Sequence, residues 1–264
     1  MDHTIDLWFA IPQTISSPHL LAQYISMLSN EEKKSKDRFH FEQHRHLYLV
    51  TRAVEKTLLS RYTGVPVTDL SFEKNEYGKP QLKVDTGLPK LYYNISHTEN
   101  LIMMAVFQEG EVGVDVEFLR RSIFPEKIAS LCFAPLEILD IASQKTWDEK
   151  SERFYEYWTL KESYIKAMGK GLAIPLQNIQ FDLTHTGRIF HTDKREKFGY
   201  WQQFSFKVDS NYLAAVCISA ASAYTCSVKM RKIVPLYSET EVQCDIMRHS
   251  ESLIKCPSGQ IPSW

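Results

Sequence analysis

Two stretches of this chain repeat one pattern at a nearly constant spacing, and this repeat constrains the fold more than any other feature. Three residues recur in the same order: Pro66, Leu70 and Phe72 correspond to Pro175, Ile179 and Phe181, an offset of 109. Residues 100–106 also resemble residues 211–216 at an offset of 110–111, and two expected helix starts lie about 105 residues apart. A chance likeness between two ordinary segments is the alternative, but the agreement of the offsets favours two similar α+β subdomains. A pseudo-two-fold would relate them, and their junction is the expected place for a pocket.

The repeat sets the expected domain limits. Residues 1–111 form the first subdomain, residues 112–221 the second, and residues 222–264 a C-terminal extension of unknown role. A chain of 264 residues, 44% of them hydrophobic, is long enough to bury a core in each half. The extension has no clear periodicity, so the sequence leaves open whether it is a flexible appendage or a strand that returns to the core.

Charge and composition exclude several classes of function. The chain has 31 Lys and Arg against 32 Asp and Glu, so its net charge is -1 and a dedicated nucleic-acid binder is not expected. Its longest apolar run, about residues 101–107, is too short to span a membrane, and no signal peptide is expected. Five scattered cysteines predict a reduced, cytoplasmic protein without a disulfide framework or a zinc site.

Hydrophobic patterning and turn signals predict the order of the local elements. Strands are expected at 5–10, 70–72, 91–93, 101–107, 112–118, 178–183, 200–208 and 212–219, and helices at 31–62, 125–143 and 150–169. Ser29 or Asn30 is expected to cap the start of the first of these helices, which can contain breaks, and Gly64 follows its end. Residues 75–80 are expected to form a turn.

The strand at 112–118 places two acidic residues on one face. Its valines at alternate positions share one face, so Asp115 and Glu117 share the other, with Cα atoms roughly 6.5–7 Å apart. Two neighbouring acids of this kind suit a hard divalent cation such as Mg²⁺, which prefers oxygen ligands. The alternative is a polar strand face exposed to solvent.

The last predicted helix carries a stripe of residues spaced by four. Phe154 and Trp158 begin the stripe and should point inward, and Glu162 and Lys166 continue it. Ionic groups on an inward face need a partner or a task, which makes both residues candidates for chemistry. The alternative is a salt bridge at the edge of the core.

A polar tetrapeptide, Asn94-Ile95-Ser96-His97, is expected to form a loop between two strands. Ser and His side chains donate hydrogen bonds to phosphate, and His also moves protons near neutral pH. A hydrolase nucleophile is not expected, since the chain has no G-x-S-x-G sequence. The alternative for residues 94–97 is an ordinary turn with a histidine on the surface. The basic residues of 33–52 are either a phosphate funnel or the solvated face of a helix.

Together these motifs resemble the 4′-phosphopantetheinyl transferases, in particular the long, monomeric type that activates surfactin synthetase. The resemblance rests on four pieces in order: Tyr77-Gly78-Lys79-Pro80, Asn94-Ile95-Ser96-His97, Gly113-x-Asp115-x-Glu117, and the block from Trp158-x-x-Lys161-Glu162-Ser163 to Gly169-x-Gly171-Leu172. It covers about residues 30–220, and the last block is the most specific. The resemblance implies two similar α+β halves with the site between them. It also implies an enzyme that moves the phosphopantetheine arm of coenzyme A, with Mg²⁺, to a serine of an acyl or peptidyl carrier protein, releasing adenosine 3′,5′-bisphosphate.

The resemblance also implies roles for individual residues. The metal ligands would be Asp115, Glu117 and Glu162. The catalytic residues would be Glu162, which we take as the candidate general base, with Lys166 and His97 beside the phosphates. Coenzyme A would contact Lys34, Lys36 and Arg45 at its 3′-phosphate, Lys74, Gly78, Lys79 and Pro80 at its adenine and ribose, and Asn94, Ser96, His97, Asp115 and Lys166 at its other phosphates. Lys161 matches the motif and serves either the phosphates or the fold.

Two other functions stay open beside this one. A non-catalytic coenzyme A-binding scaffold would keep the same motifs, and a metal-dependent pyrophosphohydrolase would use the same three carboxylates. Two residues depart from the family pattern: Glu99 adds an acid next to the Ser-His pair, and Asp37 interrupts the basic run. An acidic carrier-protein helix would dock on residues 118–124, which offer two arginines beside apolar residues, and on the helix after Pro125. A solvated loop is the alternative for residues 118–124.

Overall fold

The computed structural model describes residues 3–83, 90–119, 126–185, 189–193, 200–220, 226–243 and 245–250. The first half contains β1 (Thr4–Ala10), α1 (Pro18–Met27), α2 (Asn30–Asp37), α3 (Glu42–Thr63), β2 (Phe72–Lys74), β3 (Pro80–Leu82), β4 (Tyr92–Thr98) and β5 (Leu101–Phe107). The second half contains β6 (Val112–Phe118), α4 (Glu126–Cys132), α5 (Pro135–Ser143), α6 (Trp147–Met168), β7 (Ile179–Asp182), β8 (Phe190–Asp193), β9 (Tyr200–Asp209) and β10 (Tyr212–Ala220). The C-terminal segment adds β11 (Ser227–Val234), β12 (Ser238–Val242) and β13 (Asp245–His249).

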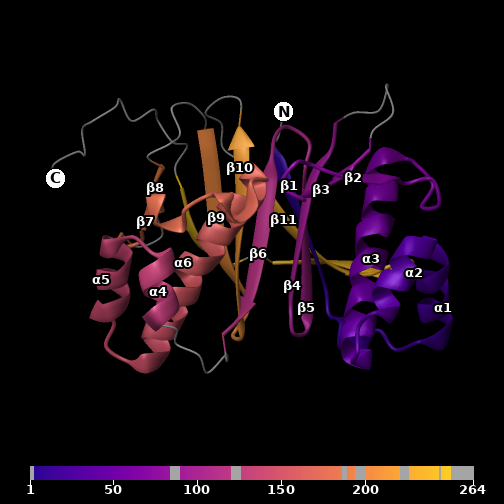
Figure 1. Ribbon diagram of the computed structural model, residues 1–264, viewed down its shortest axis with the longest axis horizontal. Coiled ribbons are helices and arrows are strands. Elements are labelled where there is room, and N and C mark those ends of the chain that lie inside the picture. Colours follow the sequence, from indigo (N-terminus) through magenta and orange to yellow (C-terminus); the bar gives the residue numbers. More distant parts are fainter. Residues whose placement is uncertain are drawn as a thin grey trace.

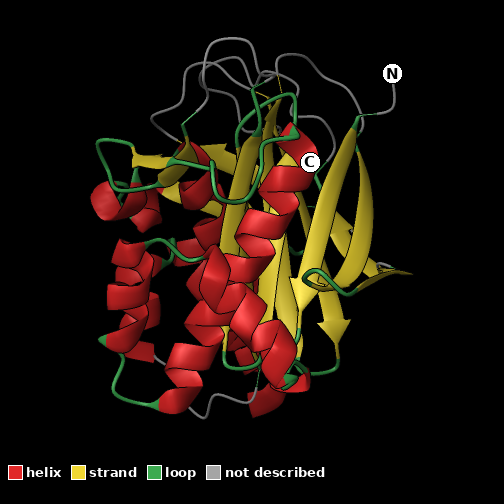
Figure 2. Cartoon of the chain, turned by 90° about the vertical axis from the view of Figure 1, so that its right-hand side faces the viewer, coloured by secondary structure: helices red, strands yellow, loops and turns green. Residues whose placement is uncertain are grey.

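The elements form four layers, with helices outside and two sheets inside (Figure 1). The first sheet has the strand order β12-β11-β1-β5-β4, and the second has the order β13-β9-β10-β6. One apolar cluster fills the space between the two sheets. Each sheet also has one apolar cluster between itself and the helices that cover it. Figure 2 views the molecule from the side of α1, α2 and α3, with strands behind them. None of the described helices is both long and apolar enough to cross a bilayer.

The same order of elements occurs twice, as the sequence repeat predicts. Each half has a long strand, three helices, a short hairpin and two further long strands. The longest helix of each half, α3 or α6, has 22 residues and covers its own sheet (Figure 1). The predicted α+β class with two similar halves is therefore confirmed, whereas the domain limits at residues 111 and 221 stay predictions.

Capping residues explain where the main helices begin and end. α2 begins after Ser29, whose hydroxyl accepts from the Glu32 amide while the Glu32 carboxylate accepts from the Ser29 amide. α3 ends at Gly64 and α6 at Gly169, with φ angles of 72° and 67°, the left-handed conformation that favours glycine. Two predicted helices are each divided in the structure, since 31–62 contains α2 and α3 and 125–143 contains α4 and α5.

The predicted loop at residues 94–97 is wrong, because these residues lie inside β4. β4 pairs with β5 along its whole length, and the turn between them is Glu99-Asn100. Tyr93 and Ile95 pack into the cluster under α3, so Asn94 and Ser96 face the other side, toward β6. Asn94 and Ser96 of this motif therefore share one face of a strand.

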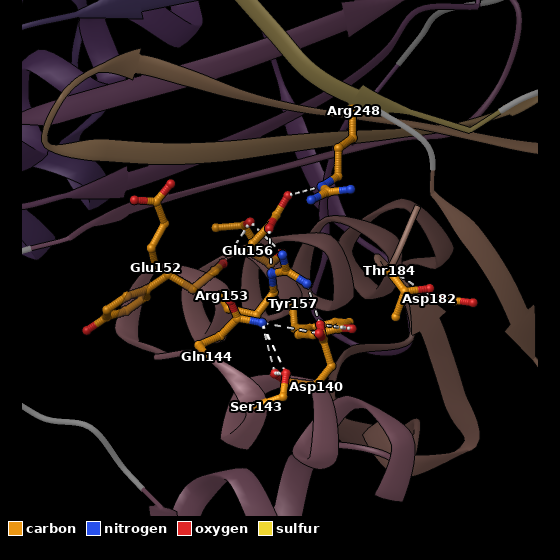
Figure 3. Close-up of polar contacts among 12 residues, drawn as sticks. Asp140, Ser143, Gln144, Glu152, Arg153, Glu156, Tyr157, Asp182, Thr184 and Arg248 are labelled. Carbon is orange, nitrogen blue, oxygen red and sulfur yellow. Dashed lines mark hydrogen bonds and ion pairs between the residues drawn. The ribbon is translucent and has the colours of Figure 1, made fainter. Parts of the chain in front are cut away.

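The C-terminal segment returns to the core as three strands, which decides between the two alternatives for residues 227–242 and 245–249. β11 lies parallel to β1 and β12 follows beside it, whereas β13 pairs with β9 in the second sheet. Arg248 of β13 donates from Nε to the buried Glu156 of α6 (2.6 Å), and Arg153 approaches the other oxygen of that carboxylate (3.2 Å). Asp140 of α5 bonds to Arg153 and accepts from the Tyr157 hydroxyl, which extends the network in Figure 3. The segment thus adds strands to both sheets and anchors α6.

Candidate active site

Polar side chains from both halves meet where β4, an edge strand of the first sheet, lies against β6, an edge strand of the second. Asn94 of β4 accepts a hydrogen bond from the Val114 backbone amide (2.9 Å). Ser96 donates from Oγ to Oδ1 of Asp115 on β6 (3.0 Å). This line of contact between β4 and β6, here named the seam, therefore holds Asp115 beside Ser96.

Asp115 is a buried carboxylate with one paired and one unpaired oxygen. Only 4% of the residue is exposed. Oδ1 accepts from Ser96 and from Nζ of Lys166 (2.6 Å), and Lys166 also donates to Ser96 Oγ (2.9 Å). Oδ2 is buried and has no hydrogen-bond partner among the described residues. A buried carboxylate oxygen without a partner is costly, so it marks a place for a cation or a donor.

Gly113 allows α6 to lie directly on β6. A Cβ atom at this position would sit 2.0 Å from the Ser163 carbonyl oxygen and 2.3 Å from the Ala167 amide nitrogen. Both are backbone atoms of α6, so the helix as a whole would have to move. The glycine of the G-x-D-x-E sequence is therefore required by packing, and this packing brings Lys166 to Asp115.

Glu162 and Glu117 complete the predicted set of carboxylates, but the three do not form one closed group. Among the described residues, no three His, Cys, Asp or Glu side chains are close enough together to hold a metal ion. Burial raises the pKa of Glu162, the nearby Asp115 raises it further, and Lys166 opposes both effects. Glu117 is half-buried on β6. The chemistry of Asp115 and Glu162 fits a divalent cation, because hard cations prefer carboxylate oxygens and Oδ2 of Asp115 is unpaired.

The stripe predicted to point inward does so at Phe154, whereas its later residues lie toward an open side of α6. Phe154 is buried and Trp158 stacks on it with nearly parallel rings (8°), but Trp158, Glu162 and Lys166 are only half-buried. The other sides of α6 are buried against the sheet and the neighbouring helices. The two ionic groups of the stripe can therefore be reached by a ligand.

His97 and Ser96 lie on opposite faces of β4, because successive residues of a strand alternate. His97 is exposed, while partial loss of hydration and then the Lys166 charge lower the pKa of its imidazole. Glu99 is exposed in the turn that follows. The structure thus brings Ser96 into the seam and leaves His97 on the other face of the same strand.

Lys161 does not reach the site, and its contacts favour a role in the fold over a contact with phosphates. Its side chain has no exposed surface, and Nζ forms an ion pair with the equally unexposed Glu137 (2.8 Å). Nζ also donates to the carbonyl oxygens of Leu176 (2.9 Å) and Ile179 (2.5 Å). Burial lowers the pKa of Lys161 and raises that of Glu137. Of the two roles left open by the motif, Lys161 has the structural one.

The turn at residues 75–80 docks on the C-terminal end of α6. Asn75 accepts through Oδ1 from two backbone amides of its own turn and donates through Nδ2 to the Gly169 carbonyl oxygen (2.8 Å). Nζ of Lys79 lies 3.1 Å from the Glu111 carboxylate and 3.2 Å from the Ala167 carbonyl oxygen. The contacts of Asn75 and Glu111 with the other half are not predicted by the sequence, because only the turn itself has a local signal. The Lys79 ammonium is engaged within the protein.

The remaining residues predicted to contact the coenzyme are on the surface. Gly78 (φ 89°) is exposed in the turn, Lys74 ends β2, and Pro80 begins β3. Gly78 has open space where a Cβ atom would lie, so a ligand can approach its backbone closely.

The three predicted basic residues of α2 and α3 lie in the outer helical layer (Figure 1). Lys34 is exposed, and Lys36 pairs with Asp37 (3.1 Å). Arg45 donates to the Phe39 carbonyl oxygen and to the Glu42 carboxylate (2.8 Å each), so it organises the loop that precedes α3. The structure does not bring these residues into the seam.

Known proteins resemble the chain over most of its length. Residues 111–217 match the 4′-phosphopantetheinyl transferase superfamily, and residues 15–109 match the N-terminal part of 4′-phosphopantetheinyl transferase. The chain is 31% identical over 199 residues to 4′-phosphopantetheinyl transferase HetI of Nostoc sp., covering 75% of this chain and 81% of HetI. It is 29% identical over 195 residues to 4′-phosphopantetheinyl transferase Sfp of Bacillus subtilis, covering 74% and 84%. The human L-aminoadipate-semialdehyde dehydrogenase-phosphopantetheinyl transferase is 28% identical over 211 residues, covering 74% and 68%.

Proposed function

This chain belongs to the 4′-phosphopantetheinyl transferase superfamily, and from that premise we propose that it modifies a serine of an acyl or peptidyl carrier protein. It is a transferase enzyme of this type, and the proposed donor is coenzyme A, with Mg²⁺ as the metal. The observation that carries the proposal is the seam cluster, in which buried Asp115 bonds Ser96 and Lys166 and keeps one oxygen unpaired.

In the proposed reaction, the serine oxygen of the carrier attacks the phosphorus that bears the pantetheine arm. A new phosphorus–oxygen bond forms, and the bond from that phosphorus to the bridging oxygen breaks, so this oxygen leaves with adenosine 3′,5′-bisphosphate. Phosphoryl transfer depends mainly on positioning and on neutralising charge. Lys166, on the open side of α6, would offset the negative charge of the leaving group.

Asp115 and Glu162 are the residues that would hold Mg²⁺, with Glu117 as the next carboxylate along β6. When bound, Mg²⁺ would withdraw negative charge from the pyrophosphate oxygens. Ser96 supports Asp115 by donating to Oδ1, and Asn94 supports it by holding β6 against β4. His97, whose side chain is exposed near the end of β4, would donate to a phosphate of the coenzyme.

Glu162 is the candidate acceptor for the proton of the carrier serine. Burial and Asp115 raise the pKa of this carboxyl group above its ordinary value, which makes its carboxylate a stronger proton acceptor. Glu162→Gln should therefore abolish transfer even at saturating Mg²⁺. Near-normal turnover of this variant would remove Glu162 from the role of base.

The nucleotide end of coenzyme A would lie along the exposed backbone of Gly78 and Pro80, with Lys74 beside it. Lys34 and Lys36 stay candidates for the 3′-phosphate, and Arg45 would act through the loop that it organises. These contacts are part of the proposal and are separate from the seam cluster.

The carrier protein would dock beside the seam. Residues 120–125, which include most of the basic and apolar stretch named for this role, lie outside the described residues. The helix that follows, α4, exposes Ile128 (42%) and Leu131 (73%). Exposed apolar side chains of this kind suit the apolar part of a partner helix. We propose that α4 forms part of the carrier-binding surface.

We further propose that the enzyme acts as a monomer in the cytoplasm. Both sides of the seam come from one chain, so no second copy is needed to complete it. Cys132 and Cys226 are free thiols, in keeping with a reducing compartment.

The test is intact-mass analysis of apo acyl and peptidyl carrier proteins after incubation with this protein, coenzyme A and Mg²⁺. We expect a mass gain of one phosphopantetheine arm, lost on chelation and in Asp115→Asn, but kept in Glu99→Gln, which changes an exposed carboxylate near the seam. Circular dichroism of Asp115→Asn checks that it folds. Binding of coenzyme A without any transfer would favour a scaffold. Cleavage of coenzyme A without a carrier would favour a pyrophosphohydrolase.

A further inference from the structure

Asn75 joins the two halves at a point that the reaction described above does not use. It lies in the turn after β2 and donates from Nδ2 to the carbonyl oxygen of Gly169 in the second half (2.8 Å). Gly169 ends α6 in the left-handed conformation (φ 67°). The last carbonyl groups of a helix have no partners within the helix, so a side chain that donates to one of them fixes the helix end.

Lys79 holds the same helix end from the same turn. Its Nζ lies 3.2 Å from the Ala167 carbonyl oxygen, 3.4 Å from the Val112 carbonyl oxygen and 3.1 Å from the Glu111 carboxylate. A positive charge at the C-terminus of a helix is favourable, because the helix dipole places partial negative charge there. The contact is close, since a Cβ atom on Gly169 would lie 3.1 Å from Asn75 Nδ2 and from Lys79 Cδ.

The helix end held in this way carries Lys166. Lys166 directly precedes Ala167, and its Nζ bonds Asp115 and Ser96 in the seam. On the other side, the backbone of α6 at this level rests against Gly113 of β6. The position of Lys166 over Asp115 thus depends on contacts from β6 and from the turn of the first half.

We propose that Asn75 is a positioning residue for the transfer reaction: by capping α6 across the two halves, it fixes Lys166 over Asp115. The inference rests on the proposed function. The two polar atoms of the Asn75 side chain make different contacts. Oδ1 accepts hydrogen bonds from the Tyr77 and Lys79 backbone amides (3.0 and 2.8 Å), which stabilise the turn. Only Nδ2 reaches α6. An aspartate at this position keeps the first set of contacts and loses the second.

The test compares wild-type protein with Asn75→Asp and with Glu73→Gln, which changes an exposed residue of the same hairpin. Asn75→Asp removes the donor to Gly169 and adds a negative charge at the negative end of α6. We expect kcat for transfer to fall about tenfold, the order of effect of one lost hydrogen bond that leaves an acceptor unpaired. KM for coenzyme A should change by less than about twofold, because the turn is kept. Amide hydrogen exchange at residues 167–169 should become faster, and Glu73→Gln should match wild type in all three measurements.

Each other outcome has a definite meaning. An unchanged kcat would overturn the proposal, and so would a rise in KM for coenzyme A alone, which would make Asn75 a binding residue of the turn. A lower kcat without faster exchange would also overturn it, because the effect would not pass through α6. A lack of transfer by the wild-type protein would count against the proposed function instead. Hydrogen exchange alone would then decide whether Asn75 fixes the helix end.

Discussion

Replacing Lys161 by methionine should destabilise the whole protein, although this residue stands next to Glu162 in the sequence. The Lys161 ammonium pairs with Glu137 at 2.8 Å, and neither side chain has exposed surface. Removing one member of a buried ion pair leaves the other charge uncompensated, at a cost of roughly 3–5 kcal/mol. The carbonyl oxygens of Leu176 and Ile179 lose their donor as well. Since the free energy of unfolding of a domain is only about 5–15 kcal/mol, the loss should be large.

Equilibrium unfolding in urea, followed by circular dichroism, measures this effect. The double variant Lys161→Met, Glu137→Gln provides the control, because it removes both charges. The Gln oxygen can still accept from one of the two amides, of Ala134 and Phe181, that now donate to Glu137. We expect the double variant to recover a large part of the lost free energy, because no bare charge stays buried.

The pH dependence of the single variant has a definite sign. Burial raises the pKa of Glu137 even beside Lys161, and loss of the ammonium raises it further. A carboxyl group with a higher pKa in the folded state destabilises the fold once the pH rises above its unfolded pKa of about 4.3. The penalty of Lys161→Met should therefore shrink as the pH falls from neutrality toward that value. In the double variant, the loss of unfolding free energy should not shrink at low pH, because no carboxyl group is present at position 137.

A small loss of stability would contradict the structural role of Lys161. A loss of less than about 1 kcal/mol, together with a higher KM for coenzyme A, would mean that the Lys161 side chain reaches the phosphates. The contact between α5 and α6 would then have to differ from the one described above.

Three further predictions concern the seam, the C-terminal segment and the docking surface. Gly113→Ala should cost roughly 1–3 kcal/mol or more in urea unfolding and abolish transfer in the intact-mass assay, because its Cβ would meet the Ser163 carbonyl oxygen at 2.0 Å. Arg248→Met should cost about 1–3 kcal/mol, since buried Glu156 keeps only one of its two arginines; an unchanged Tm would show that β13 does not anchor α6. Leu131→Glu should raise KM for a carrier protein about tenfold without changing Tm, because this side chain is 73% exposed on α4; an unchanged KM would exclude α4 from the docking surface.

Local patterns in the sequence predict most of the strands and the central carboxylate. The alternation in β6 puts Val112, Val114 and Val116 into the core between the sheets and Asp115 on the opposite face, as the structure has them. The repeat predicts that the two halves have similar elements, as they do. The loop expected at 94–97 is the main error of this kind. It arises because polar residues on an edge strand that faces a second sheet resemble turn residues.

Contacts between distant residues account for what the sequence does not predict. Lys161 and Glu162 are neighbours in one motif, yet a helix turns by about 100° per residue, so only Glu162 lies on the open side of α6. The turn signal at Asn75 predicts the bonds of its Oδ1, whereas its Nδ2 bonds Gly169, 94 residues away. Such a contact exists only once the two halves have packed together, and no local pattern encodes it.

Each half contains an equivalent Glu–Lys ion pair. This repeat explains why a structural residue and catalytic candidates are neighbours in one motif. Glu32 pairs with Lys56 at 2.8 Å in the first half, and Glu137 pairs with Lys161 at 2.8 Å in the second. Both glutamates and both lysines are 105 positions apart, and each glutamate also accepts from the backbone amide three residues before it. The pair thus joins a short helix to the long helix of each half, as part of the repeated scaffold.

The same offset of 105 relates Glu162 to Thr57 and Lys166 to Arg61. The Glu–Lys ion pair is therefore repeated in both halves, but the Glu162 carboxylate is not. Arg61 lies over the Trp8 ring and pairs with Glu239 of the C-terminal segment, whereas Lys166 meets Asp115 in the seam. The motif from Trp158 to Leu172 therefore combines two kinds of residue. Lys161 has an equivalent in the first half, Lys56, whereas Glu162 and Lys166 have no equivalent with the same contacts there. A variant that exchanges Lys161 should change stability, and one that exchanges Glu162 should change turnover.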